Sequence, residues 1–499
     1  MRILHRHSLA VILLWLFTCI VLQSVSADDR PNLILMMGDD HGWEETGFHG
    51  HPHVRTPVLD EMARTGLRLD QFYAAHPNCS PTRASFLTGR HPNRMGTFAP
   101  GWSFRPEEIT LAAMLRQSGY RCAHFGKWHA GPVRKDSPVS PGSMGFDEWV
   151  SHDNFFELNP VLSRNGADPQ RIEGESSAIL VGEAVKFLER CQQQGQPFLI
   201  VLWFGSPHEP YSGLAEDLEL YADLPARYTK PVTVTSNETG QQVQVSQGQV
   251  LQARYAEITA LDRAIGRLRG RLSDIGLRDN TLLFYCGDNG TSADAALGAP
   301  HRGTKGTMYQ GGLLVPGLIE WPRRIPRPRI SSVPASTSDL LPTVCHLAGV
   351  DLPQRPLDGQ DLSGLLEGSE LIRDQPLFFW EYISAGRNRG DPWIDPRLQA
   401  GTTPLVKKMG GKATRDFTNF HYDTWDEQSR RGPRAVVDGE WKLVLAGRQA
   451  ELFNLREDPA ELRNLAETES ATVQRLTEQL QQWQTGVLNS LTGADYRPR

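Results

Sequence analysis

Short, mainly apolar runs alternate along most of the chain with stretches in which apolar residues recur every three or four positions. The runs at 32–37, 121–125, 198–204 and 281–286 are typical of strands buried on both faces of a sheet. The periodic stretches, one of them at 258–272, are typical of helices. Because helices that alternate with buried strands form right-handed βαβ units, we predict an α/β fold with a mainly parallel central sheet flanked by helices.

Polar side chains follow each of these four strands at its C-terminal end. In open parallel sheets, ligands bind in the crevice beyond the carboxyl ends of the strands. The four polar segments should therefore lie together and form one site. They are Asp39–Asp40, Lys127–His129, His208 and Asp288–Asn289.

The pattern changes toward the C-terminus, where shorter strands take over. The segments 377–382, 435–437, 441–445 and 451–455 predict antiparallel strands, and the apolar spacing over 473–487 predicts a terminal amphipathic helix. We therefore expect a smaller C-terminal α+β subdomain with an antiparallel sheet.

A long Gly- and Arg-rich segment at 384–433 interrupts this region. A connection of this length is either disordered or a binding loop. Its aromatic faces and neighbouring cations suit a sugar, but a loop packed onto the protein explains them equally well. The aromatic residues are Trp393, Phe417, Phe420, Tyr422 and Trp425.

At 499 residues the chain exceeds the usual size of one core, so we expect a large domain and a smaller one. Basic residues before an apolar run at 9–22, and small residues at 25–27, are typical of an export signal. An uncleaved anchor is the alternative, although the run is short for a bilayer span. We predict a signal peptide at 1–27, a large domain at 28–374 and the subdomain at 375–499. The mature protein is then periplasmic or extracellular, or lysosomal or secretory in a eukaryotic host, with no stable membrane span.

The net charge of −6 argues against nucleic acid as a partner, so any anion site must be a local cluster of cations. The four cysteines besides Cys19 and Cys79 are well spread and form no C-x-x-C pair. Neither a disulfide framework nor a zinc site is indicated.

The stretch from Cys79 to Arg90 is the most distinctive in the chain. It places a thiol, a helix-starting proline and Arg83 within five positions, and Gly89 suits the end of the helix. From 6 Cys, 34 Pro and 52 Lys plus Arg, only about 0.04 such motifs are expected by chance. Cys79 would lie at a helix N-terminus, where an anion is favoured. The alternative is a buried free thiol at the start of an ordinary helix.

This stretch resembles the signature of the type I sulfatases, C-x-P-x-R followed by x-x-x-L-T-G-R, and matches it at every fixed position. Gly126–His129 is similar to the family motif G-K-W-H, and Ser206–His208 to the segment with a further active-site histidine. The run from Arg302 to Pro316 is also similar, although Gln310 and Leu314 replace the commoner Glu and Arg. The likeness spans about residues 31–465 and implies the alkaline-phosphatase-like fold, with 28–374 as the catalytic domain.

Asp39, Asp40, Asp288 and Asn289 offer hard oxygen ligands, which suit Ca²⁺ or Mg²⁺ better than zinc. Taken separately, each pair is explained equally well or better by a cap or a turn. The resemblance implies that these four side chains and residue 79 bind Ca²⁺, with Mg²⁺ as the alternative.

The resemblance also implies a mechanism. A formylglycine-generating enzyme converts Cys79 during maturation, and the hydrated aldehyde attacks the sulfur. Arg83 and Lys127 hold the hydrate, Lys305 and His208 bind the sulfate and protonate the leaving oxygen, and His129 takes a proton from the second hydroxyl. As isolated residues, Lys127 and His129 would more often be surface side chains, and His208 beside prolines is weak evidence by itself.

The leading hypothesis is a sulfuric ester hydrolase that acts on a sulfated carbohydrate or similar small molecule. One alternative is a phosphomonoester or phosphonate hydrolase with the same nucleophile. The other is an inactive homologue that binds glycans.

Overall fold

A computed structural model describes residues 30–156, 158–236, 239–298, 300–369, 371–404, 416–447 and 449–496. The predicted signal peptide at 1–27 lies outside the described residues.

The central element is a ten-stranded sheet in the order β13-β2-β12-β11-β1-β8-β4-β5-β6-β7. Its five middle strands, β11, β1, β8, β4 and β5, are mutually parallel, as are β13 and β2, whereas β12, β6 and β7 pair antiparallel with their neighbours. The prediction of a mainly parallel sheet is confirmed. The middle strands are β11 (Thr281–Gly287), β1 (Asn32–Gly38), β8 (Phe198–Trp203), β4 (Arg121–Lys127) and β5 (Glu148–His152). The outer strands are β13 (Arg329–Ser331), β2 (Leu67–Leu69), β12 (Gly317–Glu320), β6 (Val161–Arg164) and β7 (Gln170–Arg171).

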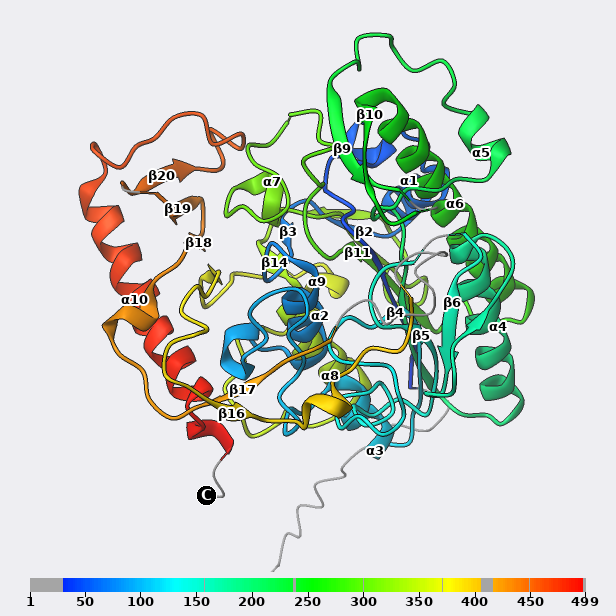
Figure 1. Cartoon of the computed structure of the whole chain (residues 1–499), viewed down its shortest axis with the longest axis horizontal. Coiled ribbons are helices and arrows are strands. Elements are labelled where there is room, and N and C mark those ends of the chain that lie inside the picture. Colours follow the sequence, from blue (N-terminus) through cyan, green and yellow to red (C-terminus); the bar gives the residue numbers. More distant parts are fainter. Residues whose placement is uncertain are drawn as a thin grey trace, which may run out of the picture.

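Helices cover both faces of this sheet (Figure 1). Side chains alternate along β1, so Ile34 and Met36 pack into one core while Leu33, Leu35 and Met37 pack into the other. The first core contains residues of α1 (Pro57–Thr65), α4 (Ser176–Gln193) and α6 (Gln247–Asp274). The second contains residues of α2 (Cys79–Thr88), α3 (Leu111–Gln117) and α8 (Leu340–Ala348).

The C-terminal part is built on a four-stranded antiparallel sheet, as the pattern predicts, in the order β15-β18-β19-β20. One face packs on the long helix α10, the red helix of Figure 1, through Val436, Leu443 and Leu476. The opposite face packs on Tyr73 and Leu313. The elements are β15 (Leu377–Trp380), β18 (Arg434–Asp438), β19 (Trp441–Leu445), β20 (Glu451–Asn454) and α10 (Ser470–Leu491).

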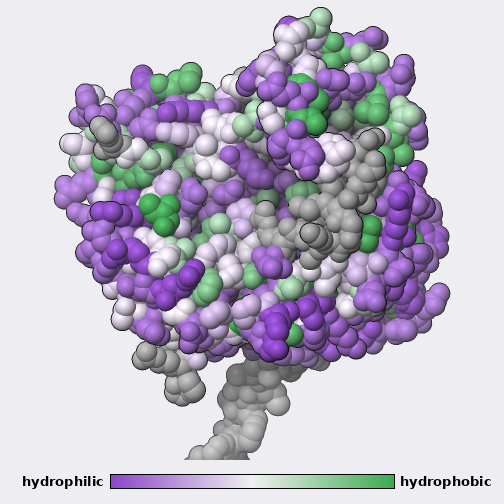
Figure 2. Space-filling view, in the orientation of Figure 1, coloured by the Kyte–Doolittle hydropathy of each residue, from purple (hydrophilic) through white to green (hydrophobic). Residues whose placement is uncertain are grey.

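The remaining elements are short. Hydrophilic residues dominate the face drawn in Figure 2, and its outline is notched between the C-terminal sheet and the lobe that carries β9, β10 and α5. The short elements are β3 (Phe72–Tyr73), β14 (Ala335–Ser336), β9 (Pro231–Thr235), β10 (Gln242–Ser246), α5 (Ala215–Glu219), α7 (Gln310–Leu313) and α9 (Ser363–Glu367).

The described part of the 384–433 segment packs onto the protein. It contains the paired strands β16 (Arg389–Pro392) and β17 (Phe420–Tyr422). Phe417 is buried, and the Asn419 amide donates hydrogen bonds to two backbone carbonyls of the 95–103 region, at 2.9 and 2.8 Å. The sequence left open whether this segment is disordered, a binding loop or a loop packed onto the protein. These contacts support a packed loop. Residues 405–415 lie outside the described part.

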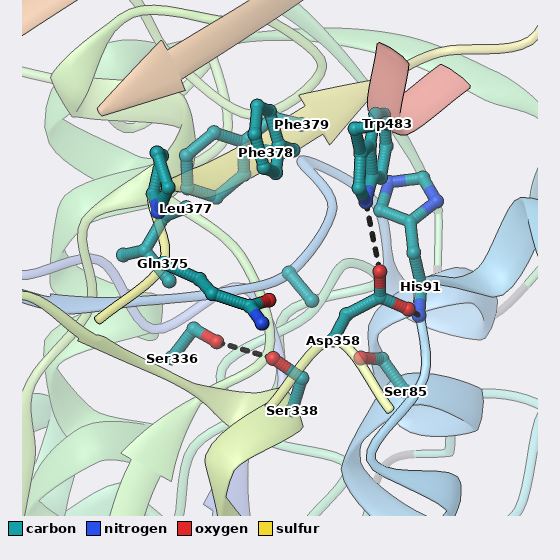
Figure 3. Close-up of a pocket in the computed structure, with 12 residues that line it drawn as sticks. Ser85, His91, Ser336, Ser338, Asp358, Gln375, Leu377, Phe378, Phe379 and Trp483 are labelled. Atoms are coloured by element: carbon teal, nitrogen blue, oxygen red, sulfur yellow. Dashed lines mark hydrogen bonds between the residues drawn. The ribbon is translucent and has the colours of Figure 1, made fainter. Parts of the chain in front are cut away.

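A small cavity of about 20 Å³ is lined by residues of α2, β15 and α10, among others (Figure 3). Along its wall the Trp483 indole donates to Asp358 Oδ1 at 2.8 Å, and the His91 backbone N–H donates to Asp358 Oδ2 at 2.6 Å. These bonds fasten the terminal helix to the core. None of the predicted site residues lines this cavity.

Candidate active site

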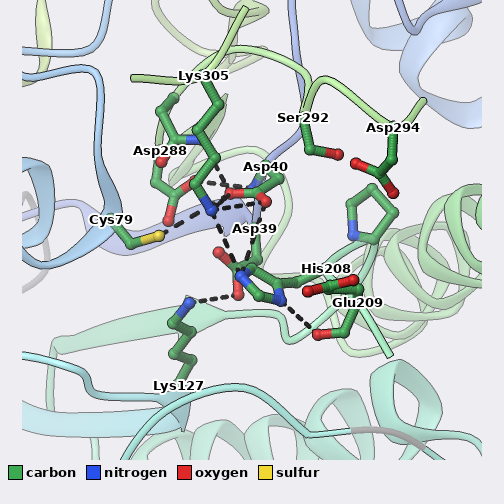
Figure 4. Close-up of polar contacts among 12 residues, drawn as sticks. Asp39, Asp40, Cys79, Lys127, His208, Glu209, Asp288, Ser292, Asp294 and Lys305 are labelled. Carbon is green, nitrogen blue, oxygen red and sulfur yellow. Dashed lines mark hydrogen bonds and ion pairs between the residues drawn. The ribbon is translucent and has the colours of Figure 1, made fainter. Parts of the chain in front are cut away.

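Cys79 is the first residue of α2, and Gly89 ends the helix with φ 67°, a left-handed conformation that glycine adopts without strain. The thiol is buried, and its Sγ lies 3.9 Å from Asp40 Oδ1 (Figure 4). Burial raises the pKa of Cys79 to about 12, although Lys127 and Lys305 act against this shift. The thiol is therefore protonated at neutral pH and is a weak nucleophile.

The acidic side chains come from two neighbouring strands. Asp39 and Asp40 follow β1, Asp288 and Asn289 follow β11, and the two strands are parallel with Gly38 opposite Gly287. The backbone N–H of Asp40 donates to Asp288 Oδ1 at 2.9 Å, and Asn289 Nδ2 donates to Asp40 Oδ1 at 2.9 Å. All four side chains are buried. The sheet register thus gathers three carboxyl groups where the sequence predicts them.

Three cations face these carboxylates (Figure 4 labels the two lysines). Arg83 donates to Asp288 Oδ2 from Nη2 at 2.7 Å and from Nε at 3.1 Å, and its Nη2 lies 3.4 Å from Asp39 Oδ1. Lys127 Nζ lies 2.6 Å from Asp39 Oδ2. Lys305 Nζ lies 2.7 Å from the carboxylate of Asp40. Three positive charges thus balance three negative charges in a buried pocket.

His208 lies beside Lys305. Its Nε2 is 3.4 Å from Lys305 Nζ and 3.7 Å from Asp40 Oδ2, while its Nδ1 is 2.5 Å from the carbonyl oxygen of Glu209. Because a carbonyl oxygen only accepts, Nδ1 carries the ring proton and Nε2 can accept one from Lys305. Burial lowers the pKa of His208 to about 3, so the ring is neutral. Phe155 stacks on this ring at 4.6 Å.

The carboxylate and amide oxygens of the site suit a hard divalent cation. Ligand atoms of Asp39, Asp40, Cys79 and His208 all lie within 4.8 Å of one another. In the described part of the chain, the buried Asn289 Oδ1 has no hydrogen-bond partner and is therefore available as an oxygen ligand. Sequence reasoning placed His208 with the sulfate, and the structure brings it to this ligand group as well.

His129 is the remaining predicted site residue. It follows β4 by two residues, is buried, and adopts φ 53°. Its backbone N–H donates to the Asp153 carbonyl at 3.1 Å, and its ring centroid lies 6.3 Å from that of Phe417. The 384–433 segment therefore covers one side of this histidine.

Comparison with known proteins identifies the family. The family model described as Sulfatase matches residues 31–350. The chain belongs to the sulfatase family. It is 32% identical over 475 residues to bovine arylsulfatase A, covering 91% of this chain and 87% of that protein. It is 29% identical over 517 residues to canine N-acetylgalactosamine-6-sulfatase, covering 93% of this chain and 87% of that protein. The crystal structure of Ps i-CgsB in complex with k-i-k-neocarrahexaose shares the fold, with a TM-score of 0.72 and 22% sequence identity. The match covers 92% of this chain and 93% of that chain.

The predicted fold class, an alkaline-phosphatase-like α/β architecture, is confirmed for this sulfatase, as is its membership among the sulfuric ester hydrolases. Among the described helices, none is both long enough and apolar enough to cross a membrane.

Gln310, which stands where the family motif commonly has Glu, contacts a buried ion pair of this sulfatase. The backbone N–H of Gln310 donates to Glu461 Oε2 at 2.6 Å, and the side chain accepts from Lys442 at 3.1 Å. Lys442 in turn pairs with Glu461 at 2.7 Å, and neither charged side chain is exposed to solvent. A carboxylate is thus supplied from the C-terminal part of the chain. Leu314, at the other unusual position, packs into the apolar core between the two parts.

Sequence reasoning missed two charged residues behind the sulfatase site, Glu45 and Arg254. They form a buried ion pair at 2.6 Å. A signal existed for Arg254, because it interrupts an apolar stripe on α6 at four-residue spacing between Val250 and Ile258. No pattern in the sequence marks Glu45.

Proposed function

We propose that this sulfatase hydrolyses sulfate esters of sulfated carbohydrates, using formylglycine made from Cys79 and a bound Ca²⁺. One observation carries the proposal. Residue 79 lies at a helix N-terminus, in contact with Asp40, inside a buried pocket where three carboxylates meet three cations.

The protonation state of Cys79 argues against the unmodified thiol as the nucleophile. A thiol whose pKa is about 12 supplies almost no thiolate at neutral pH. The aldehyde hydrate instead supplies hydroxyl groups as nucleophiles, without requiring a thiolate. The sequence around Cys79 matches the signature that implies this modification, and a formylglycine-generating enzyme is the partner that would carry it out.

Asp39, Asp40, Asp288 and Asn289 would hold the metal, together with the oxygens at residue 79. All four are buried and present carboxylate or amide oxygens, which suit Ca²⁺ and, as the alternative, Mg²⁺. When bound, such an ion supplies Lewis-acid polarisation of sulfate oxygens and neutralises part of the acidic charge.

The basic residues divide the remaining work. Lys127 and Lys305 place positive charge where sulfate oxygens would lie, and Arg83 holds Asp288 while it also donates to the Lys127 carbonyl at 3.1 Å. In the resting state the proton for the leaving oxygen is on Lys305 Nζ, because His208 Nε2 is unprotonated and faces it at 3.4 Å. His129 is proposed to take a proton from the second hydroxyl at residue 79.

The carbohydrate substrate is inferred from relatives. The name of the canine relative specifies a sulfated N-acetylgalactosamine, and Ps i-CgsB was crystallised with an oligosaccharide. We further propose that 1–27 directs export, that 28–374 is the catalytic domain, and that 375–499 forms the C-terminal subdomain.

The test uses protein purified from its natural host. Mass spectrometry of the peptide that contains residue 79 should show formylglycine, and chelation should abolish activity that Ca²⁺ restores. On paired aryl sulfate and aryl phosphate substrates, kcat/KM should favour the sulfate, and a panel of sulfated sugars should then release sulfate. A preference for phosphate would support the phosphohydrolase alternative. Unmodified Cys79 with glycan binding but no release would support the inactive homologue.

A further inference from the structure

The side chain of Arg254, on helix α6, extends toward the back of the active site. Arg254 is fully buried and projects from the face of α6 that packs on the loops following β1, β8 and β11. Its Nη2 donates to the carbonyl oxygen of Asp40 at 2.5 Å, and its Nη1 donates to the carbonyl oxygen of Pro207 at 2.6 Å. One guanidinium thus connects the backbone of a proposed metal ligand to the backbone next to His208.

Glu45 fixes the orientation of this guanidinium. Its carboxylate accepts from Arg254 Nε at 2.6 Å and from Nη2 at 2.6 Å, a bidentate arrangement that defines the plane of the fork. The same carboxylate accepts from Thr291 Oγ1 at 3.1 Å, two residues after Asn289. The ion pair therefore contacts all three loops that supply Asp40, His208 and Asn289.

The backbone conformation of Asp40 explains why the hydrogen bond from Arg254 matters. Asp40 adopts φ 61°, a left-handed conformation that non-glycine residues adopt only at some cost in free energy. The hydrogen bond from Arg254 to the Asp40 carbonyl holds the backbone in this conformation, while the Asp40 side chain faces Cys79 and Lys305.

We propose that Arg254 is a positioning residue that sets the placement of Asp40 and His208 relative to each other, and thereby the affinity of the site for its divalent cation. Arg254 acts through these two residues and is not itself a catalytic group. The inference rests on the proposed function only for the roles that it gives to Asp40 and His208.

The chain offers a matched control on the same helix. Arg269 is also buried and forms a bidentate pair with Glu320, with both bonds at 2.8 Å. It lies 15 residues further along α6, or about 22 Å at the usual helical rise. Arg254→Lys and Arg269→Lys are the same substitution in two buried bidentate pairs, and both keep the positive charge. The second pair has further partners, because Arg278 also contacts Glu320 and Glu61 also contacts Arg269. A lysine cannot donate to a carboxylate and two carbonyls in the fixed geometry of a guanidinium.

Two readouts decide the question. The first is the Ca²⁺ concentration at the midpoint of thermal stabilisation of chelator-treated protein, which needs no catalysis. The second is the pair kcat and KM on a small aryl sulfate. We expect Arg254→Lys to raise the calcium midpoint and lower kcat, each by about 10- to 100-fold, as is usual for residues that orient metal ligands. Arg269→Lys should lower the melting temperature but leave both readouts within about twofold of wild type.

The inference is overturned if Arg254→Lys behaves like Arg269→Lys in both readouts. If Arg254→Lys does not fold, Glu45→Gln replaces it, because Gln still accepts a hydrogen bond but loosens the guanidinium. A calcium midpoint unchanged from wild type would then overturn the inference, and a rise of about threefold or more would support it. Wild-type protein that releases no sulfate would refute the proposed function, whereas the calcium midpoint would still decide the role of Arg254.

Discussion

Replacing Lys127 with methionine should change metal binding and catalysis in opposite directions. Lys127 Nζ lies 2.6 Å from Asp39 Oδ2, and neither side chain is exposed to solvent. At an effective dielectric constant of about 20, two unit charges at this distance attract each other by about 6 kcal/mol. The same lysine also competes with a metal ion for the Asp39 carboxylate. Lys127→Met therefore changes the pocket from three balanced charge pairs to a net charge of −1.

Two quantities follow from this change of charge. A divalent cation should bind at least about tenfold more tightly, because one repelling charge next to it has been removed. Conversely, kcat/KM for an aryl sulfate at saturating calcium should fall by about 10²- to 10³-fold, as for the loss of one donor to a developing oxyanion. Without metal, the variant should be destabilised by about 3–5 kcal/mol, because Asp39 loses its closest cation.

The assay is a calcium titration by thermal shift after chelation, followed by steady-state kinetics on protein whose residue 79 has been checked by mass spectrometry. Lys442→Met is the matched control, because Lys442 is another fully buried lysine, 2.7 Å from the carboxylate of Glu461. It should destabilise the protein while its calcium midpoint stays within about twofold of wild type. Weaker calcium binding by Lys127→Met, or activity close to wild type, would refute this electrostatic account.

Three further predictions concern other parts of the molecule. Cys79→Ser should release no more than one equivalent of phenol from an aryl sulfate, because serine has a single hydroxyl; sustained turnover would contradict this. Burial raises the pKa of Asp262 from 3.8 to about 7, so folding takes up a proton between these values and stability falls as pH rises from about 4 to 7. The melting temperature of Asp262→Asn should therefore rise relative to that of wild type as pH increases from 5 to 8. If the difference between the two melting temperatures does not change with pH, the raised pKa of Asp262 is not a source of pH-dependent stability. Trp483→Ala loses the 2.8 Å bond to Asp358 and its packing, and should lower the unfolding free energy by about 3 kcal/mol while kcat/KM per folded molecule stays unchanged.

The parts of the site that lie at strand ends could be predicted from the sequence. An apolar run followed by Asp39-Asp40, and another followed by Asp288-Asn289, place these side chains together because parallel strands share a carboxyl edge. Lys305 follows no predicted strand. It is predicted as a site residue only because the run from Arg302 to Pro316 resembles a family motif. Its backbone N–H donates to the Thr291 carbonyl at 2.9 Å, a contact that no local pattern encodes.

The remaining contacts depend on how distant segments pack. Arg254 and Glu45 are 209 positions apart in the chain, and their pairing requires α6 to lie behind the loop after β1. The same holds for the ring of Phe155 that stacks on His208, and for the Glu461 carboxylate that accepts a hydrogen bond from the Gln310 backbone. Periodicity reports which face of a helix is buried, but it does not report what that face meets.

The balance of charge in the pocket bears on the choice between sulfate and phosphate esters. Three carboxylates and three cations surround residue 79, and His208 is neutral because burial lowers its pKa to about 3. A divalent cation would give the pocket a net charge of +2. A sulfate monoester carries one negative charge, so positive charge remains to stabilise the leaving oxygen as its bond breaks. A phosphate monoester carries about −1.5 to −2 near neutral pH and would neutralise almost all of it. With such a cation bound, the pocket would have the charge that favours departure of an alcohol from a sulfate ester.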